Sequence, residues 1–430
     1  MGWKLGRSSA LTTEVDGLTL RSVHLVESGV NMRFIFMSEG ETVPGHTHEH
    51  RYRELVDEVL LAEEVGFDAF GTSEQHVAIG TATTSAPEVI YPYLMALTKR
   101  IRFMHLVTLL PTRINHALRV AERLATEDIL SSGRVELGVG RGNTTLALRA
   151  FEVEPSENKA QLIEGLEVIR RALHNDVFSY VGEHYKIPPR SLVPKAIQRP
   201  YPPISMAAGS PDSVRKAAEL GIGAIVGGFY LGFEFVESML RIYDDALDGA
   251  THAYPLQAQK LVAVGGGMHC AETREEALKW ARNLKETVAL STDAYERLSK
   301  LSADYQYMGA VRNVDFNDER YMFEESSGFI VGDPDDCAAQ VQRFADLGAD
   351  AIVMRIDGLP HRELMKSIEL FGKYVIPRFK NPRAVVRPAD AILADIRTAR
   401  PAHYAELEAF EESKSQSNSH KSVVKVGETR

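Results

Sequence analysis

The sequence predicts a (β/α)8 TIM barrel, an α/β fold of eight parallel strands, with insertions before strand five and strand eight. Short apolar segments alternate with amphipathic helical segments along the chain, and eight of these apolar segments can be identified. Nearly continuous apolar strands are typical of a parallel sheet that is buried on both faces. Eight of them favour closure as a barrel over an open sheet. The length of 430 residues accommodates a barrel of about 250 residues with insertions.

The predicted strands are apolar runs bounded by glycine or polar residues. In chain order they are 32–37 (MRFIFM), 67–72 (FDAFGT), 101–110 (IRFMHLVTLL), 135–140 (VELGVG), 203–208 (PISMAA), 221–228 (GIGAIVGG), 260–268 (KLVAVGGGM) and 350–356 (DAIVMRI). Between them, leucine, valine and alanine recur at helical spacing, as in 51–65 and 116–132. Gly66 and Gly133 follow these two runs and are expected to end the helices.

Two longer segments interrupt the alternation. Segment 177–203 begins with the hairpin-like VFSYVGEHYKI, and segment 285–328 carries several aromatic residues, among them Tyr305 and Tyr307. The second segment is interpreted either as a lid, since closing loops keep water from a reaction, or as surface packing. Tyr305 and Tyr307 are candidates for the substrate mouth.

The barrel domain is expected at 32–380, after an N-terminal arm (1–31) and before a C-terminal extension (381–430). The last 20 residues are polar and rich in serine, so disorder is expected there.

Composition argues against several classes of protein. The formal net charge is −10, which repels nucleic acid. No apolar run reaches the roughly 18 residues of a membrane helix, and the N-terminus has no signal-peptide core. The two cysteines, Cys270 and Cys337, are far apart in sequence; Cys337 is interpreted as a buried structural thiol, and a reducing cytoplasm is expected.

Polar residues follow three of the predicted strands. They are Ser73 to His76 after strand two, Arg141 to Asn143 after strand four, and Gly209 to Ser213 after strand five. Active sites of TIM barrels lie at the carboxyl ends of the strands, so these groups are expected to form one site.

The segment after strand five is a candidate anion site. It opens a helix, and a helix N-terminus presents unpaired N–H groups and a positive dipole end. Arg141 and Lys159 could add charge. The alternative is simple helix capping by Ser210 or Asp212, with Pro211 in the first turn.

A metal-dependent hydrolase is a competing hypothesis. His46, His48 and His50 alternate after strand one, and imidazoles are common Zn²⁺ ligands. Further ligands would come from His105, His269 and Asp357. We expect no metal, and consider instead that His46 and His48 reach the substrate mouth.

The order of several segments resembles the bacterial luciferase-like flavin-dependent monooxygenases. The segments are GFDAFGTSEQH, IRFMHLVTLLPTRINHALRVAERLATEDILSSGRVELGVGRG, ENKAQLIEGL, AAGSPDSVRKAAELG and GFIVGDPDDCAAQVQRFADLGADAIVMRI. The resemblance covers roughly residues 32–379.

This resemblance implies a reduced FMN in the barrel mouth. Its phosphate would be held by Arg141, Lys159, Gly209, Ser210 and Ser213. Its ring system would be lined by Gln75, His76, Leu106, Val107 and Thr108. The Leu106–Val107 peptide corresponds to one that is often cis in relatives.

The implied reaction is activation of O2 as a peroxyflavin and oxygenation of a small organic substrate. A separate reductase would supply the reduced FMN, and a homodimer is expected. His76 would donate a hydrogen bond or act as acid or base. The family commonly has two histidines after the glutamate, whereas here the first is Gln75, which cannot titrate near neutral pH. The alternatives are a deazaflavin-dependent oxidoreductase on the same barrel and a non-catalytic flavin-binding homologue.

Overall fold

A computed structural model describes residues 32–43, 45–78, 82–227, 230–300 and 303–380. The predicted N-terminal arm and C-terminal extension lie outside these residues. No helix in the described part of the chain is both long and apolar enough to cross a lipid bilayer.

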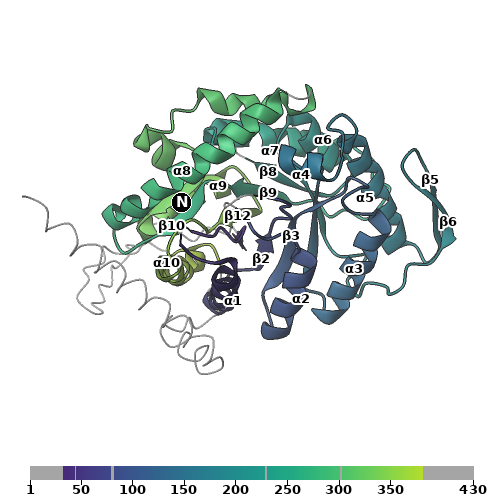
Figure 1. Ribbon diagram of the computed structural model, residues 1–430, viewed down its shortest axis with the longest axis horizontal. Coiled ribbons are helices and arrows are strands. Elements are labelled where there is room, and N and C mark those ends of the chain that lie inside the picture. The colour runs from purple at the N-terminus through teal and green to yellow at the C-terminus, as the bar shows by residue number, and fades with distance from the viewer. Residues whose placement is uncertain (1–31, 44, 79–81, 228–229, 301–302, 381–430) are drawn as a thin grey trace, which may run out of the picture.

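Eight parallel strands close into a barrel, as the sequence predicts (Figure 1). Its strands are β1 (Arg33–Met37), β2 (Ala69–Thr72), β3 (Arg102–Leu109), β4 (Val135–Gly140), β7 (Ile204–Ala208), β8 (Gly223–Gly227), β9 (Lys260–Val264) and β12 (Ala351–Arg355). They lie side by side in the order β1-β12-β9-β8-β7-β4-β3-β2, and β2 pairs with β1 to close the cylinder. Each of the eight predicted segments therefore supplies one barrel strand.

Helices surround the barrel and pack against its outer face (Figure 1). They are α1 (His48–Val65), α2 (Pro87–Leu97), α3 (Ala117–Leu130), α4 (Thr145–Ala150), α5 (Asn158–His174), α6 (Pro211–Glu219), α7 (Phe233–Asp248), α8 (Arg274–Ser299), α9 (Pro334–Asp346) and α10 (His361–Tyr374), with short helical turns η1 (Ala303–Asn313), η2 (Tyr321–Glu325) and η3 (Ile376–Arg378). As predicted, Gly66 ends α1, with a left-handed φ of 101° that favours glycine.

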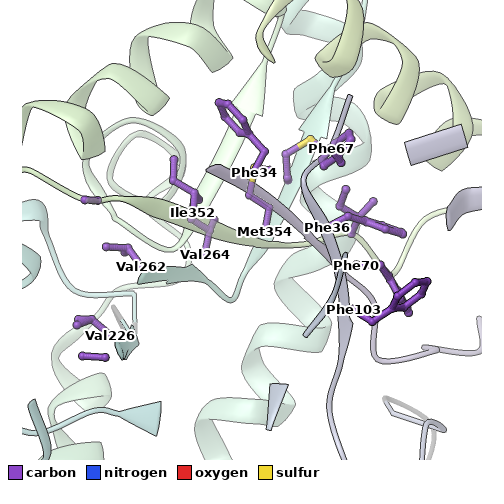
Figure 2. Close-up of a cluster of buried hydrophobic side chains, with 14 of the residues drawn as sticks. Phe34, Phe36, Phe67, Phe70, Phe103, Val226, Val262, Val264, Ile352 and Met354 are labelled. Carbon is purple, nitrogen blue, oxygen red and sulfur yellow. The ribbon is translucent and has the colours of Figure 1, made fainter. Parts of the chain in front are cut away.

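The strands are mostly apolar because both of their faces are buried. Successive side chains point to opposite faces, so Phe34 and Phe36 of β1 face the helices while Ile35 faces the barrel interior. Figure 2 shows the outer layer, in which Phe36 contacts Phe70 with their ring centroids 5.4 Å apart. The inner layer is a smaller cluster that includes Ile35, Met104 and Val353.

An ion-paired carboxylate lies among the first residues of the strands. Glu136 of β4 is buried and accepts hydrogen bonds from Arg33 of β1 and Arg102 of β3. Burial alone would raise the pKa of Glu136, but the two guanidinium groups lower it below the ordinary value. This arrangement ties three strands together at the end of the barrel away from the site.

The predicted seventh strand is too long. The segment 260–268 was expected to be continuous, but β9 ends at Val264 and a separate strand, β10 (Gly267–Cys270), pairs with β11 (Phe329–Gly332) outside the barrel. Gly267 has a φ of 143°, and a Cβ on Gly266 would lie 2.5 Å from the ring of Phe329. Glycine therefore lets the chain leave the barrel at this point and pass close to β11.

Two additions to the simple barrel lie where the sequence places insertions. The strands β5 (Phe178–Val181) and β6 (Lys186–Arg190) form an antiparallel hairpin before β7, which projects from one side of the molecule (Figure 1). The end of α8, then η1 and η2, precede β11 and β12. A small apolar cluster of Leu298, Tyr305 and Met308 holds this second addition together.

Candidate functional site

A cavity of about 290 Å³ opens at the carboxyl ends of the barrel strands. Its walls include residues at or just after every barrel strand: Met37, Gln75, Leu106, Val107, Gly140, Ala207, Ala208, Ile225, Gly227, Ala263, Val353 and Arg355. This is the position at which TIM barrels place their active sites. The predicted site residues Gln75, Leu106, Val107, Arg141 and Gly209 all line this cavity.

The insertion before β12 supplies one wall of the cavity. Tyr295 of α8 and Tyr305, Tyr307 and Met308 of η1 line it. Tyr305 and Tyr307 thus line the cavity, in the position that the sequence suggests.

A second cavity, of about 480 Å³, adjoins the first. Both are lined by Arg141, Ala207, Gly209 and Tyr307. The second is also lined by Lys159, Ser210, Ser213, Arg215 and Lys216, with Asp212 and Glu219 as its acidic residues. The predicted phosphate residues therefore all lie together, beside the N-terminus of α6.

The start of α6 is held by a reciprocal cap. The Ser210 hydroxyl oxygen accepts a hydrogen bond from the Ser213 N–H, and the Ser213 hydroxyl oxygen accepts one from the Ser210 N–H. Of the two capping residues considered, Ser210 rather than Asp212 caps the helix, with Pro211 in the first turn and Ser213 as its partner. Both serines nevertheless line the cavity, so capping and anion binding are compatible.

Arg141 is positioned by the insertion. Its guanidinium carbon lies 3.9 Å from the centroid of the Tyr305 ring, within the range of a cation–π contact. The Tyr305 hydroxyl donates to the Gly142 carbonyl at 2.8 Å and accepts from the Asn158 amide at 2.5 Å. Tyr305 is 0% exposed. One side chain of η1 therefore joins the insertion, the loop after β4 and the start of α5.

The wall formed by β3 depends on glycine in β4. The Leu106–Val107 peptide is cis, and the pairing of β3 with β4 shifts register between His105 and Thr108. A Cβ on Gly138 would lie 2.2 Å from the His105 carbonyl oxygen, and one on Gly140 would lie 2.4 Å from a Val107 methyl group. Side chains at these two glycines would therefore collide with β3 at the cavity wall.

The polar residues after β2 divide between the cavity and its surroundings. Gln75 and Glu74 line the cavity, whereas His76 is not among its lining residues. His76 Nε2 lies 2.8 Å from a Glu74 oxygen, and its ring packs edge-on against Phe151. Glu74 also accepts from the Leu109 N–H and the Asn115 amide. Glu74 therefore connects the cavity with His76.

Thr108 lies behind the cavity wall. It is buried beside Glu74, His105 and Glu127, and His105 Nε2 is 2.8 Å from Glu127. Thr108 was predicted to contact the flavin ring. From its position behind the wall, it could act on the ring only through the residues that line the cavity.

The two histidines proposed for the substrate mouth lie elsewhere. His46 is 3.6 Å from Glu54 of α1, and His48 begins α1 and is exposed. Neither lines the cavity. Across the described residues, no three His, Cys, Asp or Glu side chains are placed to hold a metal ion. The structure therefore gives no support to the metal-dependent hydrolase.

Sequence reasoning missed an ion pair in the cavity. Glu39, two residues after β1, accepts from the Ser73 hydroxyl at 2.9 Å and lies 3.4 Å from Arg355 at the end of β12. Arg355 also faces Glu41 at 2.9 Å and Asp357 at 3.4 Å. The rule that barrel chemistry follows strand ends could have identified both residues.

Comparison with known proteins agrees with this geometry. The family model described as luciferase-like monooxygenase matches residues 32–351. A 4-hydroxyprotoasukamycin monooxygenase from Streptomyces nodosus subsp. asukaensis is 27% identical over 74% of this chain and 84% of its own. An F420-dependent glucose-6-phosphate dehydrogenase from Amycolatopsis mediterranei is 27% identical over 76% of this chain and 95% of its own.

A solved structure shares the fold. It is the oxygenating constituent of 3,6-diketocamphane monooxygenase from Pseudomonas putida, in complex with FMN. It superimposes with a TM-score of 0.63 at 19% identity, over 82% of this chain and 99% of its own. The relatives thus include both flavin monooxygenases and F420-dependent dehydrogenases. This chain is a TIM-barrel oxidoreductase that belongs to the luciferase-like monooxygenase family.

Proposed function

We propose that this chain is the oxygenase component of a two-component monooxygenase. It would bind reduced FMN, delivered by a separate reductase, and use O2 to oxygenate a small organic substrate. The observation that carries the proposal is the junction of two cavities, one basic and one with apolar wall residues, at the carboxyl ends of the strands. A flavin phosphate and a flavin ring need those two environments side by side.

The basic cavity fits a phosphate. The N–H groups at the start of α6 and the positive end of its dipole favour an anion. Arg141 can donate two parallel hydrogen bonds to phosphate oxygens, while Lys159 adds a point charge. The Ser210 and Ser213 hydroxyl groups, 3.0 Å apart, can turn toward the ligand because hydroxyl hydrogens rotate.

The barrel-mouth cavity fits a flat apolar ring. Leu106, Val107 and Ile225 offer it apolar walls. Gly265 leaves room, because a Cβ there would meet no atom within 4 Å. When bound, a reduced flavin supplies the electrons that activate O2 for transfer of one oxygen atom. The protein has to exclude water and control protons.

The structure suggests how protons are managed. Gln75 presents a group that cannot titrate to the cavity. His76 would exchange protons with the site through Glu74, which lines the cavity and contacts the imidazole. The aromatic side chains of η1 line the cavity and would restrict the entry of water, which would slow the decay of a reactive species.

A second candidate is a deazaflavin-dependent dehydrogenase. The relative from Amycolatopsis mediterranei, which matches over nearly its whole length, is named for cofactor F420. F420 also has a tricyclic ring and a phosphate, so the same two cavities could hold it.

Anaerobic titration with the two cofactors tests the proposal. Chemically reduced FMN and reduced F420 are added separately, and binding is followed by fluorescence. We expect reduced FMN to bind at least about tenfold more tightly, a difference of about 1.4 kcal/mol. Arg141→Met should weaken FMN binding, whereas Arg241→Met, a matched change on the exposed face of α7, should not. Tighter binding of F420 would favour the dehydrogenase, and binding of neither would refute both.

We also propose a homodimer, formed through α2. Val89, Tyr93 and Leu97 are exposed at spacings of four residues, so they form one apolar stripe along this helix. Ile129 and Leu130 at the end of α3 are also exposed. Contiguous exposed apolar surface of this kind often marks a protein interface.

A further inference from the structure

The cavity has a second polar end, across the barrel from α6. The basic cavity adjoins β4 and β7, while Glu39 follows β1 and Arg355 ends β12. In the closed strand order, β1 is four strands from β7 and β12 is four strands from β4. In an eight-stranded barrel this separation is the full diameter. A cofactor bound from α6 would therefore leave the β1–β12 end for the substrate.

Tyr230 presents a hydroxyl group to this end of the cavity. The side chain lines the cavity and is 5% exposed. Its ring lies between Phe316 and Phe329, with centroids 5.7 and 5.9 Å away. Its carbonyl accepts from the Tyr321 hydroxyl at 3.0 Å. The backbone has a φ of 62°, which is costly for a residue with a large side chain. The ring is thus firmly held.

The Tyr230 hydroxyl makes no hydrogen bond to any residue that the structure describes. The nearby polar groups are Tyr295, Glu39 and Arg355, which also line the cavity. Burial raises the pKa of Tyr230, and burial and Glu39 raise that of Tyr295 to about 12. Both phenols therefore stay protonated and can donate. The Tyr230 hydroxyl is not among the fully buried unpaired atoms, and its side chain lines the cavity. A ligand acceptor in the cavity could therefore take the hydrogen bond that no described residue accepts.

The surrounding charges define which acceptor fits. Arg355 faces three carboxylates, those of Glu39, Glu41 and Asp357. Arg51 also pairs with Asp357, but it is shared with the carboxylates of Glu54 and Glu58. The excess of negative charge disfavours an anionic substrate. Glu39 already accepts from Ser73 and lies against Arg355, so it offers little to a cationic one. What is left is a neutral donor at the wall of a cavity that also has apolar lining residues such as Ile225 and Val353.

We propose that Tyr230 donates a hydrogen bond to the carbonyl oxygen of an uncharged organic substrate, with Tyr295 as the second donor. This inference rests on the proposed function, because it assumes that the cofactor occupies the α6 end. It assigns neutral carbonyl compounds as the substrate class and excludes carboxylates. Tyr230 is then the residue that recognises the carbonyl group.

Four aromatic probes of nearly equal shape test the inference. They are acetophenone, isopropylbenzene, benzoate and benzamidinium: a neutral acceptor, a molecule without an acceptor, an anion and a cation. Dissociation constants are measured by saturation-transfer NMR on the full chain without cofactor, so the result does not depend on turnover. We expect acetophenone to bind about threefold to tenfold more tightly than isopropylbenzene, as one neutral hydrogen bond allows, and both ions to bind more weakly than acetophenone.

Tyr230→Phe should bring the affinity for acetophenone to within about twofold of that for isopropylbenzene. Tyr254→Phe, at a tyrosine that lines neither cavity, is the matched control and should leave all four affinities unchanged. Tyr295→Phe tests the second donor and replaces the first variant if Tyr230→Phe does not fold. Glu39→Gln should improve benzoate binding by removing one negative charge.

An unchanged preference for acetophenone in both Tyr→Phe variants would overturn the inference, as would benzoate binding most tightly to the unmodified chain. The titration with reduced FMN is a separate measurement. Loss of FMN binding with the probe pattern intact would refute the proposed function alone, while normal FMN binding with the wrong probe pattern would refute this inference alone.

Discussion

Tyr305 offers the sharpest test of how the insertion serves the site. Two substitutions separate its two contacts. Tyr305→Phe removes the hydroxyl group that bonds Gly142 and Asn158 but keeps the ring against Arg141. Tyr305→Leu removes both the hydroxyl and the ring.

The structure gives the expected magnitudes. In Tyr305→Phe the Gly142 carbonyl loses its hydrogen bond from the phenol, at a cost of about 1–3 kcal/mol in the free energy of unfolding if it is left unsatisfied. The Asn158 amide keeps its second bond, to the Arg141 carbonyl. Because Arg141 still stacks on the ring, the affinity for reduced FMN should change by less than about threefold. Tyr305→Leu loses the cation–π contact, about 0.5–2 kcal/mol, and should weaken FMN binding by about threefold to thirtyfold.

Urea unfolding measures the first quantity and anaerobic titration with reduced FMN the second. Tyr254 supplies matched controls outside the cavities: the Arg170 guanidinium lies 4.0 Å from its ring and its hydroxyl donates to Glu167. Tyr254→Phe and Tyr254→Leu should reduce stability without changing FMN affinity. Equal FMN affinities in Tyr305→Phe and Tyr305→Leu would refute the claim that the ring positions Arg141.

Four further predictions follow from the same structure. Gly265→Leu should weaken reduced-FMN binding by about tenfold or more without lowering the thermal midpoint, because the new side chain enters open cavity space; unchanged affinity would place the ring elsewhere. Glu136→Gln should lower stability at pH 7. The folded-state pKa of Glu136 lies below the ordinary 4.5, so the carboxylate stabilises the fold above pH 4.5 and this contribution disappears as pH falls through the lowered pKa. Denaturant unfolding should therefore show that the difference in free energy of unfolding between variant and unmodified protein shrinks in acid. A difference that stays constant with pH would contradict the ion-pair explanation. Tyr93→Glu should convert the proposed dimer to a monomer in light scattering, and a dimer that persists would exclude α2 as the interface. His76→Ala should speed reoxidation of bound reduced flavin in stopped-flow absorbance, and an unchanged rate would remove His76 from proton control.

The strands could be predicted because their signal is local. Each barrel strand is buried on both faces, so its sequence is a mostly apolar run between polar or glycine-rich segments. The placement of the residues proposed to hold a phosphate was predictable for a similar reason. A glycine, two serines and a proline at the start of a helix lie within a few residues of one another, and the capping box forms among those residues. The exception, the end of β9, depends on the distant ring of Phe329.

The residues after β2 show where local reasoning fails. Gln75 and His76 are adjacent, and sequence alone favoured His76 for the chemistry. In the structure Gln75 lines the cavity while His76 turns toward Phe151 and Glu74. The choice depends on packing from α4, which the order of residues does not reveal.

From the sequence alone came the eight-stranded barrel, the strand ends that carry polar groups, and the candidate anion-binding residues at the start of α6. These properties follow from apolar periodicity, glycine and proline placement, and capping chemistry over short stretches of chain. Tertiary structure decided which side chains meet: Glu39 with Arg355, Tyr305 with Arg141, and Tyr230 with the cavity. These partners lie far apart in the chain and meet only because closing the barrel brings its first and last strands together, and because the insertion folds back over the strand ends.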